Sequence, residues 1–180
     1  TMARAGGILI LGGASAIANT IVENAIAESG SGLHCEDAEL SITNSEFNGN
    51  QATAGSGGAL SLLRCNASLS NVTIEGNTAA LDGGGLSGAS SAVSADIGTV
   101  FSNNQSLYGS GGGISIESAT SLMLDDVQFD GNVARDFGGG AHLSNVSDSQ
   151  IENSNFSGNT LNASTSSGGA LFVQNSTLDV

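Results

Sequence analysis

Apolar and polar residues alternate along this chain in short runs of four to six residues, a pattern typical of strands and not of helices. Apolar side chains fall two apart in these runs, as in Leu60 and Leu62 or in Ile114 and Ile116. Side chains two apart point to the same face of a strand. The pattern therefore predicts an all-β chain of short strands, each with one apolar face.

Two short signatures alternate along the whole chain. The first is an apolar residue followed three positions later by Asn, and it begins at residues 21, 47, 74, 101, 129 and 156. The second is a glycine pair followed by alternating apolar residues, as in GGALSL at 57–62 and GGALFV at 168–173. A unit of about 27 residues with short strands cannot bury an apolar face alone, but copies stacked on one another can. We therefore predict one domain over residues 1–180, a single-stranded parallel β-helix (β-solenoid) with six to seven coils. We further expect this domain to be a segment of a longer chain or filament.

Each copy of the first signature is expected to place two side chains inside the coil. Its first residue should stack on the same residue of the next coil, in the series Ile21, Phe47, Ile74, Phe101, Phe129 and Phe156. An amide carries both a donor and an acceptor, so the asparagines can bond to one another. They predict a structural ladder made of Asn24, Asn50, Asn77, Asn104, Asn132 and Asn159. The glycine pair marks another corner, and the polar residues between Asn and Gly should project as loops.

Two copies depart from the regular pattern. In GGGAHLSN, a repeat that starts at Gly138 directs Leu143 inward and His142 outward. We prefer this register because an unpaired buried imidazole is costly. In SADIGTVF the expected inward position holds Asp96, and Ile97 follows one step late. This irregularity predicts a β-bulge.

The paired signatures resemble the repeats of chlamydial polymorphic outer-membrane proteins and of related surface proteins of bacteria and algae. GGAL at 57–60 and 168–171 and the Phe-x-x-Asn copies carry the resemblance over nearly the whole chain, although several copies read GGGL or GGGI. The resemblance implies a right-handed parallel β-helix outside the cell, usually for adhesion. From the sequence as a whole we expect neither enzymatic activity nor a cofactor. Open coil ends expose unpaired backbone, so we expect copies of the chain or adjacent repeats to stack end to end as partners. Host or cell-surface receptors or glycans are further expected partners.

Composition excludes some classes of function. The formal charge is −14, with 17 acidic residues, three arginines and no lysine. Binding to nucleic acid or to an anionic membrane is therefore not expected, because phosphate contacts need Lys and Arg. No apolar run reaches the roughly 18–20 residues of a membrane span, so we expect no membrane insertion by this segment.

An enzyme that binds or cleaves polysaccharide is the alternative, because pectate lyases use a similar scaffold. Such a site needs clustered Asp beside Arg or Lys, to bind calcium and to take a proton from the sugar. The densest acidic group with a neighbouring cation consists of Asp125, Asp126, Asp130, Asp136 and Arg135. We favour a solvated acidic face, because these residues divide between a strand, a bend and a loop. His34 and His142 stand alone in the sequence, without a Ser or Cys constellation.

The two cysteines are a candidate disulfide. Cys35 and Cys65 lie 30 residues apart, and hence on adjacent coils. Their positions within the repeat differ by about three residues, so a bond would need an irregular loop to bring the sulfurs together. A disulfide and two buried thiols both remain open. Zinc is not expected, since no His or Cys cluster has metal-ligand spacing.

Seven Asn-x-Ser/Thr sequons are present. Asn104 belongs to the predicted ladder and should face inward. Asn162, in the longest projecting loop, is the strongest candidate for a glycan. The candidates for N-glycosylation are Asn66, Asn71, Asn145, Asn155, Asn162 and Asn175. A bacterial protein without N-glycans is the alternative.

Overall fold

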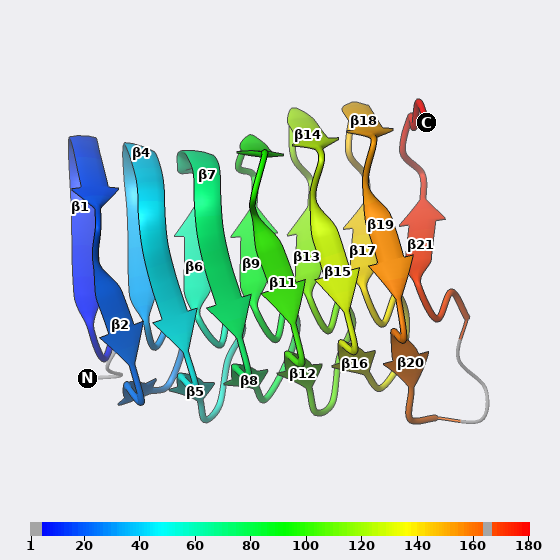
Figure 1. Cartoon of the computed structure of the whole chain (residues 1–180), viewed down its shortest axis with the longest axis horizontal. Helices are drawn as coiled ribbons and strands as arrows, with labels where there is room; N and C mark the ends of the chain where they lie inside the picture. Colours follow the sequence, from blue (N-terminus) through cyan, green and yellow to red (C-terminus); the bar gives the residue numbers. More distant parts are fainter. Residues whose placement is uncertain (1–4, 164–166) are drawn as a thin grey trace.

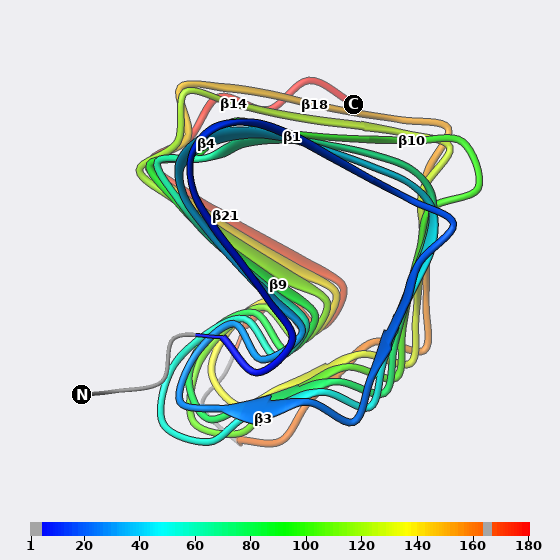
Figure 2. The ribbon, with the colours of Figure 1, turned by 90° about the vertical axis from the view of Figure 1, so that its left-hand side faces the viewer.

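The chain winds into a rod of stacked coils (Figure 1). The computed structural model describes residues 5–163 and 167–180, which form 21 strands and no helix. Every strand pairing among them is parallel and joins equivalent positions of successive coils, as Phe47 joins Ile74 at a separation of 27 residues. Seen from its N-terminal end, the chain runs clockwise as it recedes, so the coil is right-handed (Figure 2). The predicted right-handed parallel β-helix is therefore confirmed.

Each coil consists of four short runs. The first run follows the glycine pair and is formed by the start of β1 (Ile8–Ala18), the start of β4 (Leu33–Asn48), β6 (Leu60–Leu63), β9 (Leu86–Ala89), β13 (Ile114–Glu117), β17 (Ala141–Ser144) and β21 (Leu171–Gln174). The second run is formed by the later parts of β1 and β4, and by β7 (Asn66–Glu75), β10 (Val93–Asp96), β14 (Ser121–Asp125) and β18 (Asp148–Glu152).

The third and fourth runs close the coil. The third is formed by β2 (Ile21–Glu23), the ends of β4 and β7, β11 (Val100–Ser102), β15 (Gln128–Asp130) and β19 (Asn155–Ser157). The fourth belongs to a second, six-stranded sheet of two-residue strands: β3 (Ile26–Ala27), β5 (Gln51–Ala52), β8 (Thr78–Ala79), β12 (Gln105–Ser106), β16 (Val133–Ala134) and β20 (Thr160–Leu161). Loops lead from this sheet back to the next glycine pair.

Left-handed residues make the corners between these runs. Their φ angles lie between 48° and 78°, a region in which glycine and asparagine are favoured. The corner after the third run is occupied by Asn24, Gly49, Gly76, Asn103, Gly131 and Gly158. The corner before the first run is glycine in six coils, at Gly30, Gly57, Gly83, Gly111, Gly138 and Gly168. At Gly57, an added Cβ would collide with the carbonyl oxygen of Leu60. The repeat length of the sequence thus reflects the spacing of these corners along the chain.

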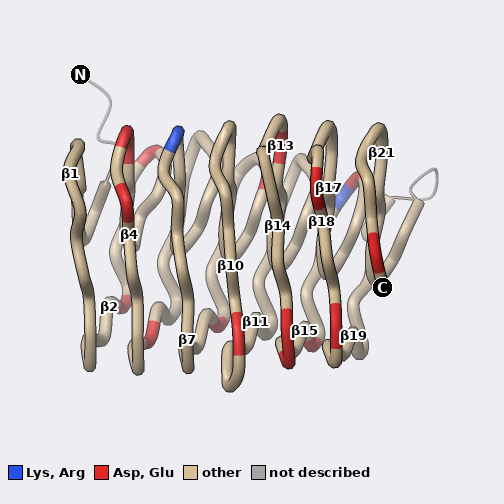
Figure 3. Tube along the Cα trace, turned by 90° about the horizontal axis from the view of Figure 1, so that it is seen from above, with Lys and Arg blue, Asp and Glu red and all other residues tan. Residues whose placement is uncertain are grey.

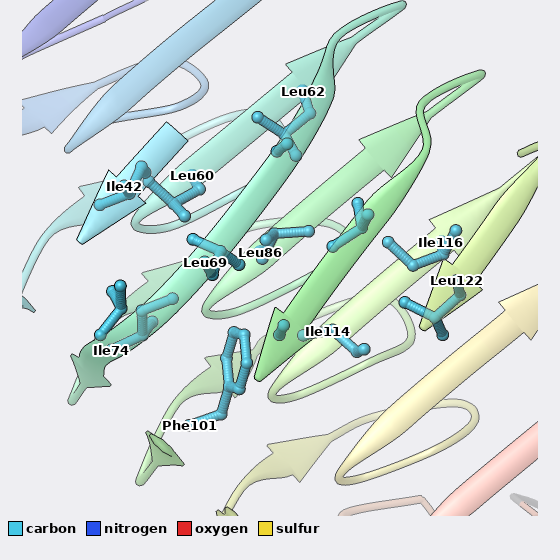
Figure 4. Packing of buried hydrophobic residues seen from close by; sticks show 14 of the residues in the cluster. Ile42, Leu60, Leu62, Leu69, Ile74, Leu86, Phe101, Ile114, Ile116 and Leu122 are labelled. Atoms are coloured by element: carbon cyan, nitrogen blue, oxygen red, sulfur yellow. The ribbon is translucent and has the colours of Figure 1, made fainter. Parts of the chain in front are cut away.

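The interior is filled by ladders of identical or similar apolar residues (Figure 4). Along the first run, Leu33, Leu60, Leu86 and Ile114 stack in register and are fully buried. Burial of such side chains stabilises the fold by about 1.5–3 kcal/mol each relative to exposure. Since each residue packs on its equivalents above and below, the core is continuous along the rod.

A second ladder contains the aromatic residues of the core. The rings of Phe101, Phe129 and Phe156 stack with centroids 5.0 and 4.5 Å apart and an interplanar angle of 4° in both pairs. The expectation that Ile21 begins this ladder is wrong. Val22 pairs with Phe47, and Ile21 is 63% exposed. In the other coils, the left-handed corner is the residue just before the ladder asparagine. In the first coil this corner is Asn24, so every position of the signature lies one residue later than the sequence pattern predicted.

The buried asparagines form a continuous hydrogen-bonded ladder. Nδ2 of Asn77 donates to Oδ1 of Asn104 (2.9 Å) and to the carbonyl oxygen of Phe47 (2.8 Å). Oδ1 of Asn77 accepts from both Nδ2 (3.0 Å) and the backbone N–H (2.9 Å) of Asn50. All four hydrogen-bonding positions of the amide are therefore used. The ladder consists of Asn50, Asn77, Asn104, Asn132 and Asn159.

Asn24 lies outside this ladder, and its assignment to it was wrong. The ladder position of the first coil holds Ala25, whose N–H donates to Oδ1 of Asn50 (3.0 Å). Asn24 occupies the left-handed corner instead, with a φ of 54°. The sequence IVEN fits both readings, and only the pairing of Val22 with Phe47 separates them.

The structure also shows how the two irregular copies are arranged. Leu143 is fully buried, and His142 lies on the outward face of β17 as predicted, although loops cover it to 6% exposure. Asp96 faces outward, level with Ser70, and not inward as expected. One extra residue lies between Asp96 and Val100 relative to the coil before, so the bulge carries Ile97 out into solvent at 66% exposure.

A disulfide joins Cys35 and Cys65 across adjacent coils, with Cα atoms 6.0 Å apart. Cys35 lies just before the corner between the first and second runs of its coil. Cys65 lies just after the equivalent corner of the next coil. Both side chains are fully buried. The corner itself therefore brings the sulfurs together, and the irregular loop that we expected to be necessary is not needed.

Replacement of a ladder asparagine should destabilise the protein strongly. Asn77→Ala leaves the amide of Asn50 and the carbonyl of Phe47 without partners in the core, which is expected to cost about 3 kcal/mol or more. Urea unfolding followed by circular dichroism measures the change. Asn103→Gly is the matched control, because glycine holds the same corner in neighbouring coils and the change should lie within about 1 kcal/mol of zero. Equal midpoints for the two variants would contradict the ladder.

Loss of the disulfide should lower stability by about 2–4 kcal/mol. The double variant Cys35→Ala/Cys65→Ala and the reduced native protein should unfold at similar, lower urea concentrations. A reductant should leave the unfolding midpoint of the double variant unchanged. If the reductant did not affect the native protein either, the bond would contribute nothing to stability.

Candidate functional site

The outward face of the first run is the most distinctive surface of the rod. One side-chain row follows it through seven coils, at Leu9, His34, Ser61, Ser87, Ser115, His142 and Phe172. The loops that return from the second sheet lie opposite this face, so the cross-section is concave there (Figure 2). A groove of about 490 Å³ occupies this concavity and is lined by His34, Ser61 and Ser87 among others.

Both histidines have serine partners one coil away. Nδ1 of His34 lies 3.2 Å from Oγ of Ser61, and Nδ1 of His142 lies 3.1 Å from Oγ of Ser115. The prediction that no serine constellation surrounds them is therefore wrong. The signal was present in the sequence, because each pair is 27 residues apart, one coil length.

These pairs do not assemble a catalytic triad. In a triad a carboxylate orients the imidazole through a hydrogen bond. Beside His34, Oε2 of Glu36 lies 3.9 Å from Nε2 of the imidazole, which is too long for such a hydrogen bond. Burial lowers the pKa of His142, and the nearby charge of Asp82 opposes that shift. Each histidine–serine hydrogen bond connects two adjacent coils.

Carboxylates gather along the same groove. Glu28, Asp82 and Glu117 line it, and no Lys or Arg from the described part of the chain is among its lining residues. Burial raises the pKa of Glu117, and the charge of Asp82 raises it further. Acidic residues follow the rest of the rod as well (Figure 3), so the whole molecule presents a negative field.

The remaining aromatic side chains belong to this side of the rod. Phe137 and Phe172 stack with centroids 4.5 Å apart, and His142 lies 5.7 Å from Phe172. Tyr108 projects from the preceding loop, with the guanidinium of Arg135 5.9 Å from its ring centroid. These contacts continue the outer face beyond the groove toward the C-terminal coils.

The structure does not assemble the acidic group considered for a lyase. Asp125 ends β14 and Asp126 forms the corner that follows it, whereas Arg135 comes after β16 in the second sheet. Nε of Arg135 lies 3.9 Å from Oδ1 of Asp136, and this pair projects with the loops. Asp130 lies on the outward side of β15, in the third run. Within residues 5–163 and 167–180, no group of three His, Cys, Asp or Glu has a metal-binding arrangement.

Another ionic contact lies at the corner between the first and second runs. Arg64 bonds to Oδ1 of Asp37 and to Oε1 of Glu36, at 2.6 and 2.9 Å. This hydrogen bonding lowers the pKa of Asp37 and raises that of Arg64. The pair is exposed to solvent, so its contribution to stability is small.

The six glycosylation candidates are all exposed. Nδ2 of Asn66 donates to Glu39 (2.8 Å) and Nδ2 of Asn71 donates to Asn44 (2.9 Å). Asn104 is fully buried in the ladder and inaccessible to a glycosyltransferase. The other candidates are Asn145, Asn155, Asn162 and Asn175, and attachment of a glycan to any of these sites remains a prediction.

No helix in the described residues has the length and apolarity needed to cross a membrane.

The family model for the Chlamydia polymorphic membrane protein repeat matches residues 98–117. This segment runs from the corner at Gly98 through β11 and β12 to the end of β13, and therefore contains one copy of each signature. Neither the curated proteins nor the solved structures include a significant match to the chain. One segment of this right-handed parallel β-solenoid, residues 98–117, is thus similar to the chlamydial polymorphic membrane protein repeat.

Proposed function

We propose that this chain is a non-enzymatic extracellular β-solenoid, a stalk, adhesive rod or fibril segment displayed on a cell surface. The observation that supports this most directly is the unbroken stack of coils that includes a repeat typical of a membrane-protein family at residues 98–117. In a solenoid the buried ladders fix the rod, while the outward side chains can vary without loss of stacking. Such a rod provides a long lateral surface for receptors or glycans.

Two features fit an extracellular setting. Disulfides persist mainly in oxidising compartments, and Cys35 is bonded to Cys65. Exposed sequons on several faces of the rod could accept glycans in a secreted protein of a suitable organism. Both features support the proposed location independently of the family resemblance.

The ends of the rod are suited to stacking. Within the described residues β1 pairs on one side only, with β4, so its other edge presents unpaired backbone groups. Ile21 and Ile26 are 63% and 66% exposed at the same end. Open edges with apolar side chains bind further strands. We propose that copies of the chain, or adjacent repeats, continue the coil end to end.

A polysaccharide lyase is the less favoured function. Its chemistry requires a cation beside clustered carboxylates, and Arg135 lies in a different run from Asp125 and Asp126. Arg64 does lie beside Glu36 and Asp37, but it is held in ion pairs with both carboxylates at a solvent-exposed corner outside the groove. The non-enzymatic rod is therefore the function that the geometry favours.

Surface display is tested on intact cells of the source organism. Antibodies raised against the rod should label intact and permeabilised cells to a similar extent. Labelling that appears only after permeabilisation would overturn the proposed location. Antibodies against a cytosolic protein of the same cells provide the control for membrane integrity.

End-to-end stacking should appear as mass that grows with protein concentration in sedimentation velocity, and as rods of increasing length in electron micrographs. Val22→Lys should abolish this growth, because it places a charge at the terminal ladder position that stacking would bury. Met123→Lys is the control, since Met123 is exposed on a lateral face. Native protein that stays monomeric at every concentration would refute stacking.

A further inference from the structure

The groove beside the first run has the size of a small-ligand site. Its volume is about 490 Å³, within the range of roughly 300–1,000 Å³ typical of such sites. One side is the outward face of β6 and β9, and the other side is formed by the loops after β3, β5 and β8. The coils follow one another along the rod axis, so the groove is elongated in that direction.

Its charged groups lie in two places. Glu28 belongs to the loop after β3, whereas Asp82 belongs to the loop after β8 and Glu117 ends β13. Backbone bonds connect Glu28 to Gly55, and Gly55 to Leu81, so Glu28 and Asp82 are two coils apart. At about 4.8 Å per coil this separation is about 10 Å along the axis.

The carboxylates have unused acceptor capacity. Oε2 of Glu28 is buried and has no hydrogen-bond partner among the described residues. Glu117 ends β13 with an exposed side chain that lines the same groove. A buried acceptor without a donor is unfavourable, and no Lys or Arg of residues 5–163 or 167–180 lines the groove. A cation from outside the chain would supply a charged donor to both carboxylates.

The floor between these acidic positions is largely apolar. Leu63 and Ala89 are half-buried neighbours in β6 and β9, and Gly88 lies beside them. The hydroxyls of Ser61 and Ser87 follow the same strands. A carboxylate, an apolar floor and a pair of carboxylates thus follow one another along the groove. This order of groups complements a molecule with ammonium groups at the two ends of a methylene chain.

We propose that this groove binds a linear polyamine, with one ammonium at Glu28, another between Asp82 and Glu117, and the methylene stem on Leu63 and Ala89. This binding function is additional to the role of the rod at the cell surface, and either can fail without the other. Ligand length is the distinguishing property, since only a molecule that spans two coils reaches both acidic positions.

Isothermal titration calorimetry of the full chain, at physiological ionic strength, tests the proposal with four probes. Diaminooctane is expected to bind at least about tenfold more tightly than diaminopropane, which is too short to span the groove, and than octylamine, which has one ammonium. Octanediol, with the same stem and no charge, should not bind measurably. Equal affinities for the two diamines, or no binding of diaminooctane, would overturn the proposal.

Two charge-matched variants separate the groove from the general negative field. Glu117→Gln should weaken diaminooctane binding by about tenfold or more, because a charged hydrogen bond is lost. Glu75→Gln removes the same charge from an exposed position of the third run and should change binding less than about twofold. Circular dichroism confirms that both variants fold. Equal losses in the two variants would show non-specific attraction and refute the site.

Discussion

The fold depends on hydrogen bonding between equivalent positions of successive coils, and the buried asparagine ladder is its most demanding instance. A buried amide without partners is costly. Here each interior amide donates twice and accepts twice, as Asn77 does, only when the coils above and below are in register. A slip of one residue would leave several polar groups unsatisfied at once. The ladder therefore specifies the register that the apolar side chains then fill.

That register explains why so few aromatic residues suffice for a core. The coil is narrow, and a side chain packs mainly on its equivalents one strand spacing away. The stacked rings of Phe101, Phe129 and Phe156 show this packing in its simplest form. The disulfide adds a covalent connection between two coils at a shared corner. Because the interior repeats, the differences between coils concentrate on the outward rows and loops, where we place binding.

Much of the architecture could be predicted from the sequence, because residues that are one repeat length apart become neighbours when the coils stack. The strand pattern, the coil length and five of the six ladder asparagines follow from the two signatures. The first coil was misassigned, since IVEN offers both Asn24 and Ala25 for the ladder and only strand pairing decides between them. The orientation predicted for Asp96 was wrong because one inserted residue shifts the alternation of inward and outward positions, and the amino-acid pattern does not show where the insertion lies.

The groove was harder to predict. Its loops have variable lengths and no periodic signal, so the approach of Glu28 and Asp82 to the outward face of the sheet depends on their conformation. The histidine–serine pairs, in contrast, lie at the coil spacing and could have been found from the repeat alone.

Hydrogen exchange of side-chain amides by NMR tests the central claim most directly. If the ladder exists, the Nδ2 protons of Asn77, Asn104 and Asn132 should exchange far more slowly than those of exposed Asn162, because opening them requires separation of coils. Exchange of the ladder amides as fast as that of Asn162 would contradict the account.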